Sequence, residues 1–396
     1  MFPTREVRVP ATWCLSSNQK SPQSAKIKES IIEWCVETGV ASRSLAQKAV
    51  AQLSPVYYMN ILFPKVDPSN PSVAKLYEIN AALIVAGYTV DDVLETYTLK
   101  ALQELDNFFR STEAWVSSLK PDKYPTLKEL SESLPELSVP YSRAVICMFI
   151  DNFNKYSHEI WSNIVPLSQV QTFRRRLSAS VTAYLKMAMA KKQNDGKIDE
   201  KEFLWRRSAD NLGFPVLMLS EVVSGLLKDQ CKSISATRLH YFHMYSNLFA
   251  HVLNDLNSYH RDIHTEHNSL VKLWLQAGIA SDIDDAGSKI VEFLNSAIIN
   301  IHRSVETIQA EHPNCVALSN FVESISYTFA GWVHVHTTAV ERYKLSPFQI
   351  TLRKVEEEDV QQWLQNETEF GRRCVRMFDE LMQEREKEMV LIYGLN

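Results

Sequence analysis

The chain has 396 residues, of which 45% are apolar and 22% are charged, and its formal net charge is −5. This balance is typical of a globular protein with a large core. The acidic net charge argues against a surface that binds nucleic acid, and we expect no nucleic-acid partner.

The first residues of the chain and the spacing of its cysteines indicate where in the cell the protein is expected. The first 15 residues lack the apolar core of a signal peptide, and no apolar run approaches the length needed to cross a bilayer. We therefore expect no membrane span. The six cysteines are spaced singly, without a CxxC pair. This spacing favours neither a zinc site nor a disulfide framework, and it fits a reducing compartment. The sequence predicts a cytoplasmic protein.

The element pattern is helical almost throughout. Residues 1–25 contain three prolines and several Ser, Gln and Lys, and we predict that they form an irregular N-terminal arm. From residue 26 to residue 396, apolar residues recur at helical spacing, and no stretch alternates convincingly with a period of two. Polar breaks fall at residues 64–71, 120–140, 193–199 and 281–285. The pattern predicts one large all-α domain over residues 26–396.

The first candidate site follows the apolar stretch 81–90. Asp91, Asp92 and Glu95 form a DDxxE motif, in which Asp91 and Glu95 lie one helical turn apart. Acidic side chains at the end of an apolar helix can bridge metal ions to a bound phosphate group. Alone the motif has little specificity, and the alternative is an ordinary acidic helix end.

The second candidate site is the most specific one. Asn254, Ser258 and Asp262 lie at positions i, i+4 and i+8, which places them on one stripe of a helix. Their amide, hydroxyl and carboxylate oxygens are hard ligands that suit Mg²⁺. The residues before them are strongly apolar, so the stripe opens from a buried helix. The alternative is a solvated helix face.

The third candidate site is the dipeptide Arg342-Tyr343, which follows the apolar stretch 331–336. A guanidinium can grip two phosphate oxygens with its planar fork, and a tyrosine hydroxyl can donate a third hydrogen bond. The dipeptide has no specificity by itself and gains its meaning from the motifs before it.

Together, in this order and at this spacing, the motifs resemble those of the class I terpene synthases. Arg206 and Arg207 lie a little under fifty residues before Asn254, about where that family places its diphosphate-sensing arginine. The segments NDLNSYHRDIHTEHNSLVK and HTTAVERYKLS look most like the fungal trichodiene synthase group. The resemblance covers residues 30–350 in order and helical pattern. It implies an isoprenoid-synthase helical domain with a central active-site cavity, which ionises a prenyl diphosphate with magnesium and cyclises the carbocation. Farnesyl diphosphate is the favoured substrate, as in sesquiterpene cyclases.

The resemblance also implies a role for each motif residue. Asn254, Ser258 and Asp262 would chelate one Mg²⁺, and Asp91 would bind two more with Asp92 and Glu95 in support, three ions in all. Diphosphate binding would fall to Arg207, Arg261, Arg342 and Tyr343, of which Arg342 and Tyr343 join Asp91 as catalytic residues. Arg207 is preferred over Arg206, but the choice stays open. Asp262 stands where the family more often has Glu, so it must sit slightly closer to the metal.

A carbocation requires a dry cavity with aromatic walls. Ile84, Gly87 and Tyr88 precede Asp91 by seven, four and three residues, and thus share its helix face. Trp332 stands close to the corresponding face before Arg342. Tyr88 and Trp332 are therefore candidate cation-stabilising rings, with ordinary core aromatics as the alternative.

Two further motifs are explained better by helix capping than by catalysis or calcium binding. Asp282 to Asp285 spells the DxDD motif of class II cyclases, but the chain is too short for that multidomain architecture, and Asp282 or Asp284 can cap a helix. The segment 193–203 resembles half of an EF-hand loop without its leading carboxylates, and a capping pair of Asp199 and Glu202 explains it better.

Two other functions compete with the cyclase. A chain-elongating prenyl diphosphate synthase would carry a second Asp-rich motif where this chain has the Asn254–Asp262 block. A non-catalytic helical interaction protein could retain remnants of a prenyl-diphosphate site, although every ligand type is retained here. The sequence leaves the product and the oligomeric state open, including a homodimer.

Overall fold

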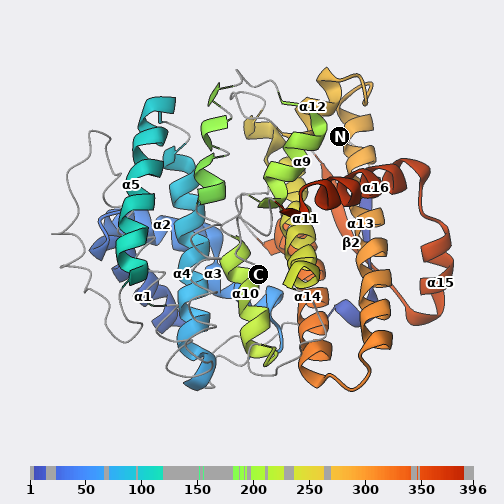
Figure 1. Cartoon of the computed structure of the whole chain (residues 1–396), viewed down its shortest axis with the longest axis horizontal. Helices are drawn as coiled ribbons and strands as arrows, with labels where there is room; N and C mark the ends of the chain where they lie inside the picture. Colours follow the sequence, from blue (N-terminus) through green and yellow to red (C-terminus); the bar gives the residue numbers. More distant parts are fainter. Residues whose placement is uncertain are drawn as a thin grey trace.

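The computed structural model describes the chain over residues 4–14, 24–66, 71–94, 97–118, 198–209, 213–226, 236–262, 269–339 and 348–387, with isolated residues between 151 and 193 and at 346. Helices pack side by side in the described part, and a pair of short strands lies beside α13 (Figure 1). The predicted all-α class is confirmed.

The described elements are α1 (Ser24–Glu37), α2 (Arg43–Leu53), α3 (Pro55–Leu62), α4 (Pro71–Leu94), α5 (Leu99–Ser118), α9 (Glu200–Ala209), α10 (Gly213–Val223), α11 (Ala236–Asp262), α12 (Leu270–Gln276), α13 (Ile283–Glu311), α14 (Val316–His334), η2 (Val335–Ala339), α15 (Glu357–Gln365) and α16 (Glu369–Glu384), with strands β1 (Thr4–Pro10) and β2 (Gln349–Val355) and the short turn η1 (Ala11–Trp13).

Side-chain caps define where several helices begin. The Ser42 hydroxyl accepts a hydrogen bond from the Leu45 amide at α2, and the Thr368 hydroxyl accepts one from the Gly371 amide at α16. Each cap satisfies a backbone donor that has no partner within its helix. Pro55 opens α3 at the position where a missing backbone donor costs nothing.

The core lies between α14 and its neighbours. Helix α14 packs against α3, α10 and α11, and its apolar residues join one continuous buried cluster. Gly331 allows the contact with α3, because a Cβ atom at this position would lie 2.9 Å from the Ile61 carbonyl oxygen. The close packing therefore brings the end of α14, where Trp332 lies, against the end of α3.

The N-terminal arm is more regular than the sequence predicted. Residues 4–10 form strand β1, which pairs in parallel with β2 from Thr4 opposite Gln349 to Pro10 opposite Val355. Val7 and Val9 are buried, whereas Glu6 and Arg8 are not. On the other side of β1, the Asn295 side chain of α13 accepts from the Arg8 amide at 2.7 Å and donates to the Glu6 carbonyl at 3.1 Å. The arm was expected to be irregular because its alternation spans only a few residues and its partner lies about 345 residues away along the chain.

The oxidation state of one cysteine also differs from the sequence prediction. Cys14, Cys35 and Cys374 are free thiols, whereas Cys315 is disulfide-bonded. Single spacing did not indicate this bond, because a disulfide joins residues that only the fold brings together. Within the described ranges, no helix combines the length and apolarity that crossing a membrane requires.

Candidate active site

Helix α11 carries the predicted stripe without interruption. Asn254, Ser258 and Asp262 all lie in this one helix, and Asp262 is its last residue. Ser258 is buried, whereas Asn254 is half-buried and stays partly accessible to solvent. The side chains of Arg261 and Asp262 lie outside the described residues.

An ion pair links α11 to α9. Arg207 Nη2 donates to Asp255 Oδ1 at 2.8 Å, with the two side chains 11% and 0% exposed. Asp255 Oδ2 also accepts the Leu270 amide at the start of α12, at 2.9 Å. A buried carboxylate is tolerated when its charge is paired and its oxygens accept hydrogen bonds. Asp255 therefore sets Arg207 beside the Asn254 turn of α11.

Sequence reasoning missed Asp255. Only oxygen ligands spaced four residues apart were considered in the Asn254–Asp262 block, and Asp255 does not lie on that stripe. The signal was present as a carboxylate between the apolar residues Leu253 and Leu256, since a charged residue among buried ones requires a partner.

The neighbouring arginine points elsewhere. Arg206 Nε pairs with Glu202 Oε1 at 2.6 Å within α9, and Glu202 also accepts a hydrogen bond from Arg385 beyond the end of α16. Of the two adjacent arginines, Arg207 is thus the one that contacts the helix of the Asn254 block.

Helix α4 carries the acidic motif at its far end. Asp91 and Asp92 lie in its last turn, and Ile84 is buried two turns earlier. Gly87 and Tyr88 are also in α4, but the side chains from residue 86 onward lie outside the described residues, as does all of Glu95. The common helix face of Ile84, Tyr88 and Asp91 stays a prediction.

Helix α10 packs against both α4 and α11 and lies between them (Figure 1). Its Glu221 carboxylate meets His243 of α11, where Glu221 Oε1 and His243 Nε2 are 2.7 Å apart and both side chains are buried. The two helices that carry the predicted ligands therefore share one packing partner.

Trp332 occupies the centre of this region. Its indole Nε1 donates to Ser246 Oγ of α11 at 3.0 Å, and its side chain is buried. The His336 imidazole Nδ1 donates to the Trp332 carbonyl at 2.8 Å, and burial lowers the pKa of His336 to about 4. The imidazole is therefore neutral near pH 7, and the indole ring is held against α11.

The pair Arg342-Tyr343 lies outside the described residues. The described residues on either side of it both contact α11: η2 packs on this helix, and the Ser346 hydroxyl lies 3.4 Å from the Leu256 carbonyl oxygen. Leu256 belongs to the turn between Asn254 and Ser258.

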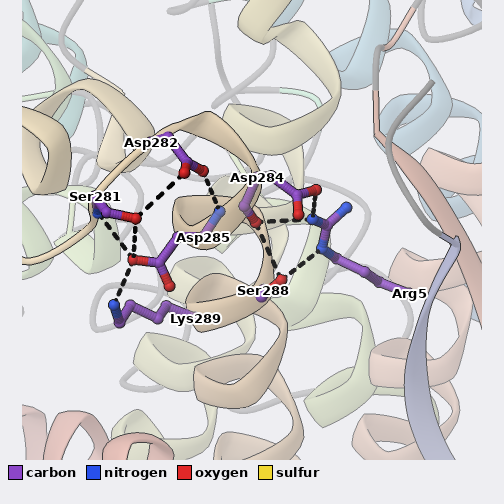
Figure 2. Close-up of polar contacts among 7 residues, drawn as sticks. All are labelled: Arg5, Ser281, Asp282, Asp284, Asp285, Ser288 and Lys289. Carbon is purple, nitrogen blue, oxygen red and sulfur yellow. Dashed lines mark hydrogen bonds and ion pairs between the residues drawn. The ribbon is translucent and has the colours of Figure 1, made fainter.

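The capping explanation of the DxDD motif is confirmed, and that of the segment 193–203 is confirmed in its Asp199 half, whereas the Glu202 carboxylate pairs with Arg206 and Arg385 and residues 194–197 lie outside the described residues. Asp282 caps α13 through a hydrogen bond from the Asp285 amide at 2.9 Å, and Asp285 itself pairs with Lys289 (Figure 2). Asp199 Oδ1 accepts the Glu202 amide at 2.9 Å at the start of α9.

Comparison with known proteins gives a fold but no relative in sequence. No protein-family model matches the chain, and no curated protein matches it either. Among solved structures, 2-methylisoborneol synthase from Streptomyces coelicolor A3(2), in complex with Mg²⁺ and 2-fluoroneryl diphosphate, is similar with a TM-score of 0.59 at 17% identity, covering 83% of this chain and 95% of that one. Linalool/nerolidol synthase from Streptomyces clavuligerus is similar with a TM-score of 0.53 at 15% identity, covering 81% and 98%.

This chain has the class I terpene synthase fold. The resemblance found in the motifs is thereby confirmed at the level of the fold. Identity this low shows the fold alone, because one fold hosts many functions. Among the described side chains, no group of three His, Cys, Asp or Glu residues comes together to hold a metal. The carboxylates of Asp91, Asp92 and Asp262 are not among those side chains.

Proposed function

We propose that this chain is a magnesium-dependent terpene synthase, a sesquiterpene cyclase that ionises farnesyl diphosphate and cyclises the carbocation. One observation carries the proposal: the Asn254 block lies in a single helix of a terpene synthase fold, with Arg207 paired to Asp255 within that block. An arginine beside a stripe of oxygen donors is the arrangement that a metal-bound diphosphate requires.

The donor set of α11 fits magnesium. Asn254 offers an amide oxygen and Ser258 a hydroxyl one helical turn later, and neither is a soft ligand that would favour a different metal. Asp262 would complete this set, and Asp91, with Asp92 and Glu95, would supply the carboxylates for two further ions. When bound, the three Mg²⁺ ions neutralise the charge that develops on the leaving diphosphate.

The residues of the chain then bind the substrate and shape its path. Arg207, Arg261, Arg342 and Tyr343 hold the diphosphate. The allylic C–O bond breaks and both of its electrons leave with the diphosphate oxygen. The cation cyclises between Ile84, Gly87, Tyr88 and Trp332, and loss of a proton gives a neutral hydrocarbon. The Ser246 hydrogen bond keeps the Trp332 ring in one orientation, which is what a ring needs to stabilise a cation through its face.

The test is incubation of the purified protein with geranyl, farnesyl and geranylgeranyl diphosphate, each with and without magnesium. Released pyrophosphate is quantified, and the extracts are analysed by gas chromatography–mass spectrometry. We expect magnesium-dependent release and a cyclic C15 product from farnesyl diphosphate. Release that requires added isopentenyl diphosphate would identify a prenyl diphosphate synthase instead. No release from any of the three would favour the non-catalytic interaction protein.

Two finer points belong to the same proposal. The fungal trichodiene synthase group remains the proposed nearest relation on the strength of the motif segments, whereas the two named similar structures come from Streptomyces. We also propose a cytoplasmic location, where prenyl diphosphates and magnesium would both be at hand. A secondary-metabolic role follows from a cyclic terpene product.

A further inference from the structure

Arg5 of strand β1 is a buried charge with an unusually complete set of partners. Its side chain is 6% exposed, and its guanidinium forms an ion pair with the Asp284 carboxylate at the start of α13. It also donates to the Asp284 carbonyl oxygen at 2.7 Å and to the Ser288 hydroxyl at 3.1 Å (Figure 2). A buried guanidinium is tolerated only when its donors are satisfied, so these contacts define the position of β1 on α13.

The same guanidinium lies against Phe348, the residue that leads into β2. The Arg5 Cζ atom is 5.6 Å from the centroid of the Phe348 ring. A second neighbour of this ring is α11, where the Tyr259 and Phe348 centroids are 6.0 Å apart. Tyr259 directly follows Ser258. A contact chain therefore runs from the N-terminal strand through one aromatic ring to the predicted metal-binding turn.

Hydrogen bonds of the Ser346 side chain join the same region to α11. The Ser346 hydroxyl contacts the Leu256 carbonyl at 3.4 Å and accepts the Phe348 amide at 3.2 Å. Ser346 thus contacts α11 between the turns of Asn254 and Ser258, and it lies three positions after Tyr343 in the sequence. β1 pairs with β2 immediately beyond this segment, with Arg5 opposite Ile350.

Gly287 shows how closely α13 approaches this cluster. A Cβ atom on Gly287 would lie 2.5 Å from Phe348 Cε1 and 3.3 Å from Arg5 Cζ. Cβ atoms essentially never come so close to a neighbouring atom, so a side chain at 287 would displace the ring. The Phe348 ring is thus confined by Arg5, α13 and α11 together, and displacing it must disturb Tyr259.

We propose that Arg5 is a positioning residue for the diphosphate site. It acts through Phe348, which it holds against Tyr259 of the helix that carries Asn254 and Ser258. This role rests on the proposed function for the identity of the ligand. In this proposal, the Asp284 carboxylate of the DxDD motif holds Arg5 in place through their ion pair.

The test measures binding of inorganic pyrophosphate in the presence of magnesium, by isothermal titration calorimetry at a temperature where circular dichroism shows each variant folded. Three variants perturb the cluster in different ways. Arg5→Met removes the charge, Arg5→Lys keeps it with fewer donors, and Gly287→Ala presses on Phe348 with Arg5 intact. Arg353→Met is the matched control, because Arg353 forms an exposed ion pair with Glu6 on the same two strands.

We expect Arg5→Met and Gly287→Ala to weaken pyrophosphate binding about tenfold, equivalent to ~1.4 kcal/mol. Arg5→Lys should lie between these variants and the wild type, and Arg353→Met should stay within about twofold, as expected for an exposed pair. A purely structural role would lower the melting temperature and leave the affinity of the folded protein unchanged.

Wild-type affinity in Arg5→Met and Gly287→Ala would overturn the inference while leaving the proposed function intact. If Arg5→Met does not fold, Gly287→Ala and Arg5→Lys decide. Binding of magnesium and pyrophosphate without turnover of any prenyl diphosphate would refute the proposed function, and the same variants would still decide the role of Arg5. A wild-type protein that binds no pyrophosphate would overturn both.

Discussion

Arg207 of α9 and Asp255 of α11 form an ion pair of 2.8 Å in which the carboxylate is fully buried. The two residues are 48 positions apart in the chain, and their contact aligns α9 with the turn of α11 that carries Asn254. The second carboxylate oxygen accepts the Leu270 amide, so the same residue also binds the first turn of α12, which Ser269 caps. One aspartate thus orders three helices around the candidate site.

Asp255→Asn should destabilise the fold by about 3–5 kcal/mol, the usual cost of removing one partner from a buried ion pair. The cost arises because Arg207 keeps its charge without a counter-charge. Urea denaturation would measure it. The double variant Arg207→Met/Asp255→Asn should lose less than the sum of the two single variants. Arg43→Met, which breaks exposed ion pairs with Glu29 and Glu33, serves as the control and should leave the unfolding free energy close to that of the wild type. Additive losses would mean that the pair is energetically unimportant.

Asp91→Asn and Asn254→Ala should each reduce pyrophosphate release by about a hundredfold or more, since even loss of a residue that supports a metal ligand costs 10–100-fold. Stopped-assay release of pyrophosphate at saturating magnesium measures this. The matched control for the aspartate is Asp359→Asn in the exposed first turn of α15. Near-normal turnover by either site variant would refute the metal assignment.

Magnesium and pyrophosphate together should raise the melting temperature by more than the sum of their separate effects. Both ligands bind only the native state, and each creates part of the site of the other, so the stabilisation is coupled through mass action. Differential scanning fluorimetry over a grid of both concentrations measures the coupling. Asn254→Ala, which retains the arginines, should abolish the synergy. Simple additivity in the wild type would count against a shared site.

The sequence predicted the helices and the motif positions because both depend on local periodicity. The stripe of Asn254 and Ser258 needs only 3.6 residues per turn to align, and α11 is continuous through it. The caps at Asp282 and Asp199 were predictable for the same reason, since a cap bonds to an amide three residues later.

Pairs that are distant in sequence were not predictable. Arg5 lies in the segment that the sequence predicts to be an irregular arm, and its burial depends on contacts with Asp284 and Ser288, which lie 279 and 283 positions later. The alternation in β1 is meaningful only because β2 supplies its hydrogen-bond partners. A single sequence without co-variation does not identify the partners in such contacts, so the sequence could indicate that Asp255 needs a partner but not that the partner is Arg207.

His336→Gln should remove a pH dependence of stability between pH 6.5 and about 4. Burial lowers the pKa of this imidazole to about 4 in the folded state, against a usual value of 6.5. The unfolded chain therefore binds more protons in this window, and the wild type loses stability as the pH falls, by on the order of 3 kcal/mol. The measurement is the difference between the wild-type and variant free energies of unfolding at several pH values. This difference cancels the contributions of titrating groups that both proteins share. Asp379 is one such group, because burial raises its pKa. A constant difference from pH 7 to pH 4 would contradict the assignment.

Tyr88→Leu should change the products more than the rate. Tyr88 lies in α4 one helical turn before Asp91, so its ring is predicted to face the allylic chain of a substrate anchored at the acidic motif. A ring face stabilises a desolvated cation by roughly 1–2 kcal/mol. This energy is small beside the charge neutralisation that drives ionisation, yet each ~1.4 kcal/mol shifts a product ratio about tenfold. Pyrophosphate release should therefore stay substantial, while gas chromatography–mass spectrometry shows more linear or early-quenched terpenes. Tyr57→Leu, which removes a half-exposed tyrosine that contacts His334, is the control and should leave the profile unchanged. An unaltered product profile in Tyr88→Leu would make Tyr88 an ordinary core aromatic.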